Sequence, residues 1–360
     1  MRIVSLLPAG AEIVCALGLG EALVGVSHEC AYPPEVIGKP AVTRGLLPVE
    51  AMTQAQIDAE MSRRLQAGEP IYEVDGELLE RLAPDLVITQ ELCEVCAASP
   101  KDLSAALAGL GRLPRVLQLT PHTLEDILGN IVEVGEAVGR SEAAVRLTQA
   151  LWGRIERVRA TAARADHRPR VFCMEWIDPP YCSGHWVPEM VAICGGVDKL
   201  SRRGEDSVRV PWSAVLDWAP DVLVVMACGY GLDEAVRQAR ALPALPGWAA
   251  LPAVRQGRVH VVDANSYFAC PGPRVVEGVE LLAQLIHPDL FEWSGPAGAV
   301  SPLRTKACAR CGEAFSCRPE PGCWCEAERL PAGTAAALSR TYGDCLCPRC
   351  LTGAAREAVG

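Results

Sequence analysis

The sequence is poor in aromatic residues and in positive charge. Aromatic residues make up 5% of its 360 residues, although eight of them are tryptophans. With 34 lysines and arginines against 44 aspartates and glutamates, the formal net charge is -10 at pH 7. An acidic chain lacks the positive field that non-specific binding to nucleic acid requires. We therefore do not expect nucleic acid as a partner.

Long apolar runs are also missing. No stretch reaches the roughly 18 uninterrupted apolar residues of a membrane helix. The short run from Ile3 to Leu7 is followed by Pro8 and Glu12 and preceded by a single basic residue, which argues against a secretory signal. The same run fits the fold as a first strand. We therefore predict no membrane span, a cytoplasmic location and reduced cysteines.

Three common enzyme motifs are absent as well. The sequence contains no P-loop lysine motif, no Gly-x-Gly-x-x-Gly dinucleotide fingerprint and no Gly-x-Ser-x-Gly elbow. Gly18-Leu-Gly20 ends a predicted helix and does not open one, so it is not a phosphate-binding loop. These absences favour a binding protein over an enzyme.

Residues 121–169 predict two consecutive helices with almost no strand signal. Thr123 and Asp126 form a variant of the capping box at the start of the first helix. The second helix, capped by Ser141, should continue to about Asp166 and span roughly 37 Å at about 1.5 Å per residue. We interpret the segment as a rigid spine between two lobes. The alternative is one ordinary long helix inside a single domain.

The same landmarks recur in the same order on both sides of this spine. Residues 78–89 and 214–225 each place Ala-Pro-Asp before an apolar strand, and Arg115-Val and Arg258-Val each open a later strand. Such ordered copies predict an α/β fold of two similar, Rossmann-like βα lobes bridged by a long helix. The predicted parts are an N-terminal lobe (1–120), the spine (121–169), a C-terminal lobe (170–292), a loose linker (293–302) and a cysteine-rich module (303–360).

Polar and sulfur-containing side chains follow many of the predicted strands. Ligands of open α/β sheets bind beyond the carboxyl ends of the strands, so the two lobes would share a cleft there. Imidazole and thiolate suit zinc, cobalt, iron or copper, and Trp176 or Trp186 could stack on a flat ring. The candidate ligand-binding residues are Ser5, Pro8, His28, Glu29, Cys30, Glu91, Cys93, Cys96, Glu175, Trp176, Tyr181, Cys182, His185, Trp186, Cys228, Tyr267, Cys270 and Arg274.

Several of these stretches resemble a known family. Ser5-Leu-Leu-Pro-Ala-Gly-Ala-Glu, Leu23-Val-Gly-Val-Ser-His-Glu-Cys, the Ala-Pro-Asp strand, the mid-chain helix and Gly257-Arg-Val resemble the cobalamin and iron-siderophore substrate-binding proteins of ABC transporters. The similarity covers roughly residues 1–290 and is closest to members that lack an export signal, called cobalamin-binding proteins. It implies a class III substrate-binding-protein fold, with a corrinoid, haem or metal chelate held between the lobes.

Eight of the 17 cysteines fall within the last segment of the chain. The two Cys-x-x-Cys pairs, Cys308/Cys311 and Cys347/Cys350, could close one tetrahedral thiolate site, for which zinc is the expected metal. An iron–sulfur cluster and oxidised disulfide pairs are the alternatives. The spacing resembles the small module named for its Cys-Trp-Cys core. The remaining cysteines, which could complete a second metal site, are Cys317, Cys323, Cys325 and Cys345.

Three functional hypotheses follow from these patterns. The first is a binding protein that holds a metal-containing tetrapyrrole or related chelate, cobalamin among them, without turnover. The second is a chelatase-like enzyme in which His185 or His28, beside Glu175 or Glu91, accepts a pyrrole proton while a metal enters the ring. The third is a metal-ion binding or partner-docking scaffold that uses the cysteine-rich tail to contact a protein.

Overall fold

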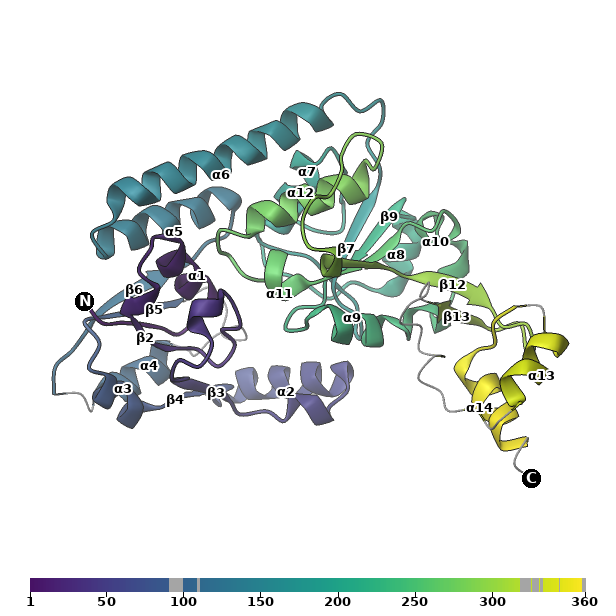
Figure 1. The fold of residues 1–360 in the computed structure, drawn as a ribbon, viewed down its shortest axis with the longest axis horizontal. Helices are drawn as coiled ribbons and strands as arrows, with labels where there is room; N and C mark the ends of the chain where they lie inside the picture. Colours follow the sequence, from purple (N-terminus) through teal and green to yellow (C-terminus); the bar gives the residue numbers. More distant parts are fainter. Residues whose placement is uncertain are drawn as a thin grey trace.

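The structure, a computed structural model, describes residues 1–90, 100–108, 111–317, 325, 330, 333–342 and 344–357. Within these residues the chain forms two α/β lobes, a pair of helices that runs along both, and a small tail at one end (Figure 1). The predicted α/β class and two-lobed arrangement agree with this architecture.

A parallel four-stranded sheet in the order β2-β1-β5-β6 forms the centre of the first lobe. Strands β1 and β5 are buried at every position, as expected of central parallel strands covered on both faces. The elements of this lobe are β1 (Ile3–Ser5), α1 (Pro8–Ala16), β2 (Leu23–Val26), β3 (Thr43–Gly45), α2 (Gln54–Ala67), β4 (Tyr72–Val74), α3 (Gly76–Leu82), β5 (Leu86–Gln90), α4 (Pro100–Leu107) and β6 (Arg115–Leu119).

Helix α2 stands apart from this sheet. It is inserted between β3 and β4, which form an antiparallel pair of their own. Thr53 begins the helix with a full capping box that includes Gln56. Of its 14 residues only Gln54 and Ile57 are buried, and the helix extends away from the first sheet toward the second lobe (Figure 1). Few buried contacts therefore hold the helix in place, and they lie near its N-terminal end.

The spine consists of α5 (Leu124–Ala137) and α6 (Ser141–Ala162). Thr123 and Asp126 form the capping box predicted for α5. The second helix differs from expectation at both ends, because Arg140 is its N-cap and the helix ends at Ala162, before the predicted Asp166. Its 22 residues correspond to about 33 Å, which still spans both lobes. Helix α5 packs on α1 of the first lobe, and α6 packs on two helices of the second lobe, α7 and α12.

A five-stranded sheet in the order β11-β10-β9-β7-β8 forms the second lobe, with β10, β9 and β7 parallel. The all-apolar strand Val222–Val225 lies at its centre and is fully buried. The elements are β7 (Val171–Trp176), β8 (Tyr181–Cys182), α7 (Val187–Ile193), α8 (Trp212–Trp218), β9 (Val222–Val225), α9 (Leu232–Ala239), α10 (Pro252–Arg255), β10 (Val259–Val262), α11 (Ala264–Tyr267), α12 (Val275–Ile286) and β11 (Val300–Pro302).

The repeated Ala-Pro-Asp motif performs the same structural task in both lobes. In each copy the alanine ends a helix in the left-handed conformation, with φ of 42° and 47°. The aspartate then accepts a hydrogen bond from the backbone N–H that precedes the first strand of its lobe, from Arg2 to Asp85 at 2.8 Å and from Arg170 to Asp221 at 2.9 Å. The duplication seen in the sequence is therefore also a duplication of hydrogen bonds.

The tail begins inside the second lobe, which differs from the loose linker predicted at 293–302. Strand β11 lies in that range and pairs antiparallel with β10. Leu303 is buried in the core of the second lobe, and its N–H donates to the carbonyl of Val259 at 2.9 Å. The module then continues through β12 (Arg304–Ala307), β13 (Ala314–Cys317), α13 (Thr334–Thr341) and α14 (Pro348–Glu357). Strand β13 packs on a short 3-10 turn of the second lobe, Leu242–Ala244, so the module is docked at its first strands.

None of the helices within the described ranges combines the length and the apolar character that crossing a bilayer demands.

Candidate functional site: a cleft between the lobes and a thiolate cluster in the tail

A small cavity of about 50 Å³ lies where the two lobes meet. Gln90, the last residue of β5, lines it from the first lobe. The other described lining residues come from the second lobe and are Glu175, Gly184, His185, Trp186, Val187, Met226, Cys228, Phe268, Ala269 and Pro271. Gln90 and Glu175 lie at the carboxyl ends of β5 and β7, so the cavity is at the edge of the sheets where α/β folds bind ligands. Of the eighteen residues predicted for the site, it brings together Glu175, His185, Trp186 and Cys228.

Glu175 is held by two hydrogen bonds in a half-buried position. The Ser207 hydroxyl donates to its carboxylate at 2.6 Å, and the Gly184 N–H donates as well. Burial raises the pKa of Glu175 above its ordinary value, although both hydrogen bonds act in the opposite direction. The cavity therefore contains an acid that is easier to protonate than a surface glutamate.

His185 presents a neutral imidazole at the cavity. Its backbone is left-handed, with φ of 52°, and is fixed by its N–H donating to Glu205 O and its carbonyl accepting from Gly204. Burial lowers the pKa of the ring, and the Asp206 carboxylate opposes that shift. The ring nitrogen Nε2 lies 3.1 Å from Asp206 Oδ1. Among the described residues Nε2 is buried without a hydrogen bond of good geometry, and the Asp206 carboxylate is its ionic neighbour. A neutral imidazole in this state is a suitable ligand for a soft metal.

Trp186 has a structural role next to this histidine. Its indole N–H donates to the carbonyl of Phe268 at 2.9 Å, and the side chain is buried. Trp176, the other tryptophan proposed as a stacking platform, is itself stacked on Tyr230, with ring centroids 5.5 Å apart and planes inclined by 15°. Both indoles therefore already have packing partners.

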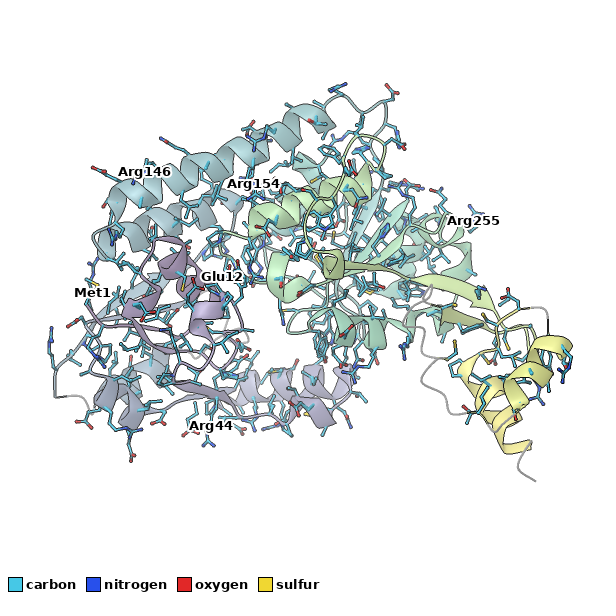
Figure 2. The ribbon with its side chains drawn as sticks, in the orientation of Figure 1. Met1, Glu12, Arg44, Arg146, Arg154 and Arg255 are labelled. Atoms are coloured by element: carbon cyan, nitrogen blue, oxygen red, sulfur yellow. The ribbon has the colours of Figure 1, made fainter. Side chains whose placement is uncertain are left out.

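A buried ion pair joins the lobes beside the cavity. Arg274, which precedes α12, forms a salt bridge with Glu12 of α1, and its Nε lies 3.1 Å from Glu12 Oε2. The Cys270 thiol donates to Glu12 Oε1 at 3.6 Å. The guanidinium also lies over the ring of Tyr32, 3.8 Å from its centroid, and 6.0 Å from the centroid of Tyr267. Two predicted site residues, Cys270 and Arg274, thus contact Glu12, and a third, Tyr267, lies beside Arg274. Glu12 is labelled in Figure 2.

A second contact between the lobes is made by α2, and we call it the α2 clamp: Gln54 and Asp58 with Tyr181 and Arg209. The Gln54 side-chain oxygen accepts from the backbone N–H groups of residues 177 and 178, at 3.0 and 3.1 Å. The Tyr181 hydroxyl donates to Asp58 at 2.7 Å, and Arg209 donates to the same carboxylate at 2.6 Å. Because Gln54 and Asp58 are four residues apart, they share one face of the helix.

The remaining predicted cleft residues that the structure describes are not among those that line the cavity. Ser5 is fully buried and donates to the carbonyl of Leu7, and Pro8 opens α1. Cys182 is a buried core residue. His28 bonds Thr43 at 2.8 Å, and Glu29 bonds Tyr72, both beside the β3–β4 pair. Burial raises the pKa of Cys30 to about 12, so this half-buried thiol is protonated. Glu91, Cys93, Cys96 and Cys323 lie outside the described residues.

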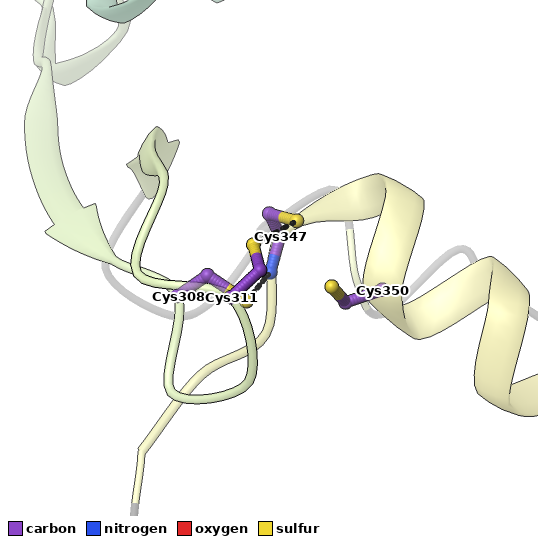
Figure 3. A group of neighbouring side chains, drawn as sticks. All are labelled: Cys308, Cys311, Cys347 and Cys350. Atoms are coloured by element: carbon purple, nitrogen blue, oxygen red, sulfur yellow. Dashed lines mark hydrogen bonds between the residues drawn. The ribbon is translucent and has the colours of Figure 1, made fainter.

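The two Cys-x-x-Cys pairs converge in the tail (Figure 3). The four sulfurs of Cys308, Cys311, Cys347 and Cys350 all lie within 4.8 Å of one another. The Cys347 N–H donates to the Cys308 sulfur at 3.2 Å. Although burial acts to raise it, the pKa of Cys308 is lowered to about 6 by backbone N–H groups. Gly312 follows the first pair with φ of 76°, which a glycine adopts without strain. This is the donor set of a closed tetrahedral site.

The other tail cysteines in the described range are not part of this cluster. Cys317, Cys325 and Cys345 pack around it in the small core of the module. In the described part of the chain, the four clustered thiols are the only group of three or more histidine, cysteine or acidic side chains whose donor atoms come this close. The cavity therefore holds no preassembled site for a bare ion among those residues.

Sequence reasoning missed the first-lobe partners of the cleft. Glu12, Gln54 and Asp58 bond residues more than a hundred positions away, so no local pattern marks them. One signal was available for Glu12, an acid within a helix that is otherwise apolar, since a buried carboxylate needs a partner.

Comparison with known proteins gives consistent relatives. The chain is 26% identical over 302 residues to the uncharacterized ABC transporter substrate-binding lipoprotein YvrC of Bacillus subtilis, covering 81% of each chain. It is 25% identical over 283 residues to a vitamin B12-binding protein of Vibrio cholerae, covering 78% of this chain and 86% of that one. Among solved structures, the periplasmic heme-binding protein RhuT of Roseiflexus sp. RS-1 superposes with a TM-score of 0.61 at 26% identity, covering 80% and 98% of the two chains.

These relatives overturn the prediction of a cytoplasmic location, which is wrong. The family that matches residues 3–266 is described as periplasmic binding protein, and the Bacillus relative is a lipoprotein. The prediction used the place of the first strand in the core, but that place fixes the position of residues 3–5 in the fold and not the compartment. The expectation of reduced cysteines depended on the location and loses its support.

The resemblances drawn from the sequence are confirmed. The tail matches the cysteine-rich CWC family over residues 308–352. The match over residues 3–266 is to a family of substrate-binding proteins, which also confirms the prediction of a binding protein and not an enzyme. The fold of two βα lobes on a helical spine is shared with the solved relatives. The chain belongs to the periplasmic binding protein family.

Proposed function

We propose that the cleft between the lobes binds a metal-containing tetrapyrrole or a related metal chelate, for delivery to an ABC transporter. The observation that carries the proposal is the neutral, half-buried imidazole of His185, which lines a cavity at the carboxyl ends of the strands. The names of the relatives support the ligand class, because they include vitamin B12-binding and heme-binding proteins.

The size of the cavity sets a condition on this function. Sites for compounds of drug size typically enclose about 300–1,000 Å³, whereas the cavity here encloses about 50 Å³. A tetrapyrrole therefore requires the lobes to separate. The contact between the lobes that gives way is the α2 clamp, whose Arg209 is more than half exposed, while the buried Glu12–Arg274 pair stays closed.

The test is titration of the purified protein with cyanocobalamin, with haemin and with zinc as a bare ion. If His185 ligates the metal of the chelate, His185→Asn should weaken binding at least tenfold, about 1.4 kcal/mol, and shift the absorption spectrum of the bound chelate. Asparagine is the suitable replacement because it tolerates the left-handed backbone found at this position.

His28→Asn is the matched control, since His28 does not line the cavity, and it should leave affinity and spectrum unchanged. Failure of both cyanocobalamin and haemin to bind below about 100 μM, or equal effects of the two substitutions, would contradict the proposed role.

We also propose that the tail thiolates, Cys308, Cys311, Cys347 and Cys350, bind zinc. Four sulfurs at mutual distances within 4.8 Å suit one tetrahedral ion at about 2.3 Å from each. The module has few buried apolar residues, so the metal would supply much of its folding free energy. The module as a whole offers a surface at the end of the molecule away from the cleft, where a protein partner could dock (Figure 1).

A further inference from the structure

The arginines at the boundary between the lobes are already neutralised by carboxylates. Arg274 pairs with Glu12, Arg209 pairs with Asp58, and each of these pairs joins the two lobes. Arg203 pairs with Glu189, whose carboxylate also accepts from the backbone N–H at the start of α5. These three boundary arginines therefore each have a carboxylate partner within the protein.

The pair nearest the cavity is also the most deeply buried of the three. The Glu12 side chain is 3% exposed and that of Arg274 is 15% exposed, whereas Arg209 and Arg203 are more than half exposed. Residues 268, 269 and 271 line the cavity, and between them the Cys270 thiol donates to Glu12. The segment that walls the cavity is therefore in direct contact with this ion pair.

The cavity itself offers no positive charge. None of its described lining residues is a lysine or an arginine, and its one ionisable acid is Glu175. The imidazole of His185 is neutral, because burial lowers its pKa.

Metal tetrapyrroles fall into two groups with respect to charge at the ring edge. Haem bears ionised propionates, whereas the ring of cobalamin bears uncharged carboxamides. A carboxylate that enters a partly buried site without a counter-ion loses hydration that nothing replaces. An uncharged amide loses less hydration free energy on entry, and it can form hydrogen bonds with Gln90 and Glu175.

We infer, resting on the function proposed above, that this cleft selects metal chelates with uncharged amide side chains over those with ionised carboxylates, and that Glu12 determines the selection. By occupying the guanidinium of Arg274, Glu12 removes the least exposed of the three boundary arginines described above, which a ligand carboxylate could otherwise use. Specificity of this kind arises because the disfavoured ligand would leave its charge unpaired in the site.

Matched ligands test the selection in the unaltered protein. Haemin and its dimethyl ester share one iron porphyrin and differ only in the propionate charges. Cobalamin and a cobalamin derivative hydrolysed to a monocarboxylate at one side-chain amide form the second pair. We expect the uncharged member of each pair to bind at least tenfold more tightly in titrations monitored by absorbance.

Glu12→Gln tests the residue itself, because it preserves shape and frees the charge of Arg274. We expect the preference for uncharged ligands to fall at least tenfold, chiefly through tighter binding of the carboxylates. Adding Arg274→Gln should abolish that gain. Glu280→Gln is the matched control, since it breaks another arginine–glutamate pair, with Arg154, between α12 and the spine. It should leave the preference unchanged.

The outcomes separate this inference from the proposed function. If none of the four chelates binds, the proposed function is wrong. If chelates bind but haemin binds as tightly as its ester, the function stands and the charge selection is refuted. Should Glu12→Gln fail to fold, the comparison of ligand pairs in the unaltered protein still decides whether the selection exists.

Discussion

At the scale of single residues, Glu175 is a strand residue whose carboxyl has a raised pKa. It lies in β7 and lines the cavity, and burial raises the pKa of its carboxyl above the ordinary value of 4.5. A carboxyl whose pKa is raised on folding contributes stability while it is protonated, and that contribution is lost as pH rises through the raised pKa. Ionisation of the Glu175 carboxyl therefore lowers the free energy of unfolding.

Glu175→Gln is predicted to remove this pH dependence. Glutamine mimics the protonated acid, so the stability of the variant relative to the unaltered protein should increase as pH rises from 4.5 through the raised pKa. Denaturant unfolding at pH 5 and pH 8 measures the two differences. A variant that is relatively less stable at pH 8 than at pH 5 would contradict the assignment.

Single residues of the site were predictable where their position follows from a strand end. Glu175, His185 and Cys228 were expected in the cleft because they follow predicted parallel strands, and they line the cavity. The partners of Glu12 and Asp58 were not predictable, since they come from the other lobe. Side-chain periodicity indicates which face of an element is buried, but it does not indicate how two lobes are set against each other.

At the level of elements, α2 is tied to the second lobe by its first turns. The amide N–H groups of Ile177 and Asp178 both donate to the Gln54 side chain. Only two residues of the helix are buried, so these bonds contribute a large part of what holds it. Segments with few buried contacts open locally at low free energy.

Gln54→Ala is predicted to release this contact. The amides of Ile177 and Asp178 should exchange with deuterium roughly fivefold faster or more, since one net hydrogen bond contributes about 1 kcal/mol. Hydrogen exchange followed by mass spectrometry or NMR would detect it. Gln66→Ala, an exposed position near the other end of the same helix, is the control and should leave both amides protected. Unchanged exchange in Gln54→Ala would mean that the clamp does not hold the lobes together.

The existence and order of the strands and helices could be predicted better than the residues at which they begin and end. The Ala-Pro-Asp motifs located a helix exit and a buried strand in each lobe, and both copies form the same hydrogen bonds. The end of α6 was misjudged because residues 163–166 continue an apolar and polar pattern that a helix tolerates, while the structure ends the helix at Ala162. Strand β11 was missed because its glycine- and proline-rich surroundings are typical of a linker.

Across the whole molecule, the two lobes are not independent units. A single hydrophobic core extends from Ile3 and Ile13 of the first lobe through Ile131 and Ile155 of the spine to Val279 of the second. Separation of the lobes therefore has to pivot on a packed spine. This favours small movements at the cleft over wide opening.

The tail, in contrast, has a core of its own. Its boundary with the second lobe falls after Leu303, which is buried among second-lobe residues, and not before it. Strand β12 pairs only with β13, so removal of residues 304–360 cuts no strand of the second sheet. The module should then be separable from the lobes in both folding and metal content.

We predict that the full chain, purified under reducing conditions, contains about one zinc ion held by four thiolates, and that the chain ending at Leu303 contains none yet remains folded. Elemental analysis and thermal unfolding measure both properties. Cys350→Ser should lose the metal because it removes one of four ligands, whereas Cys228→Ser, at a cysteine of the cleft, should keep it. Zinc retained by the truncated chain would assign the metal to the lobes instead. If the full chain purified without reductant is metal-free and has fewer free thiols than its sequence contains, the result would favour disulfides in the tail.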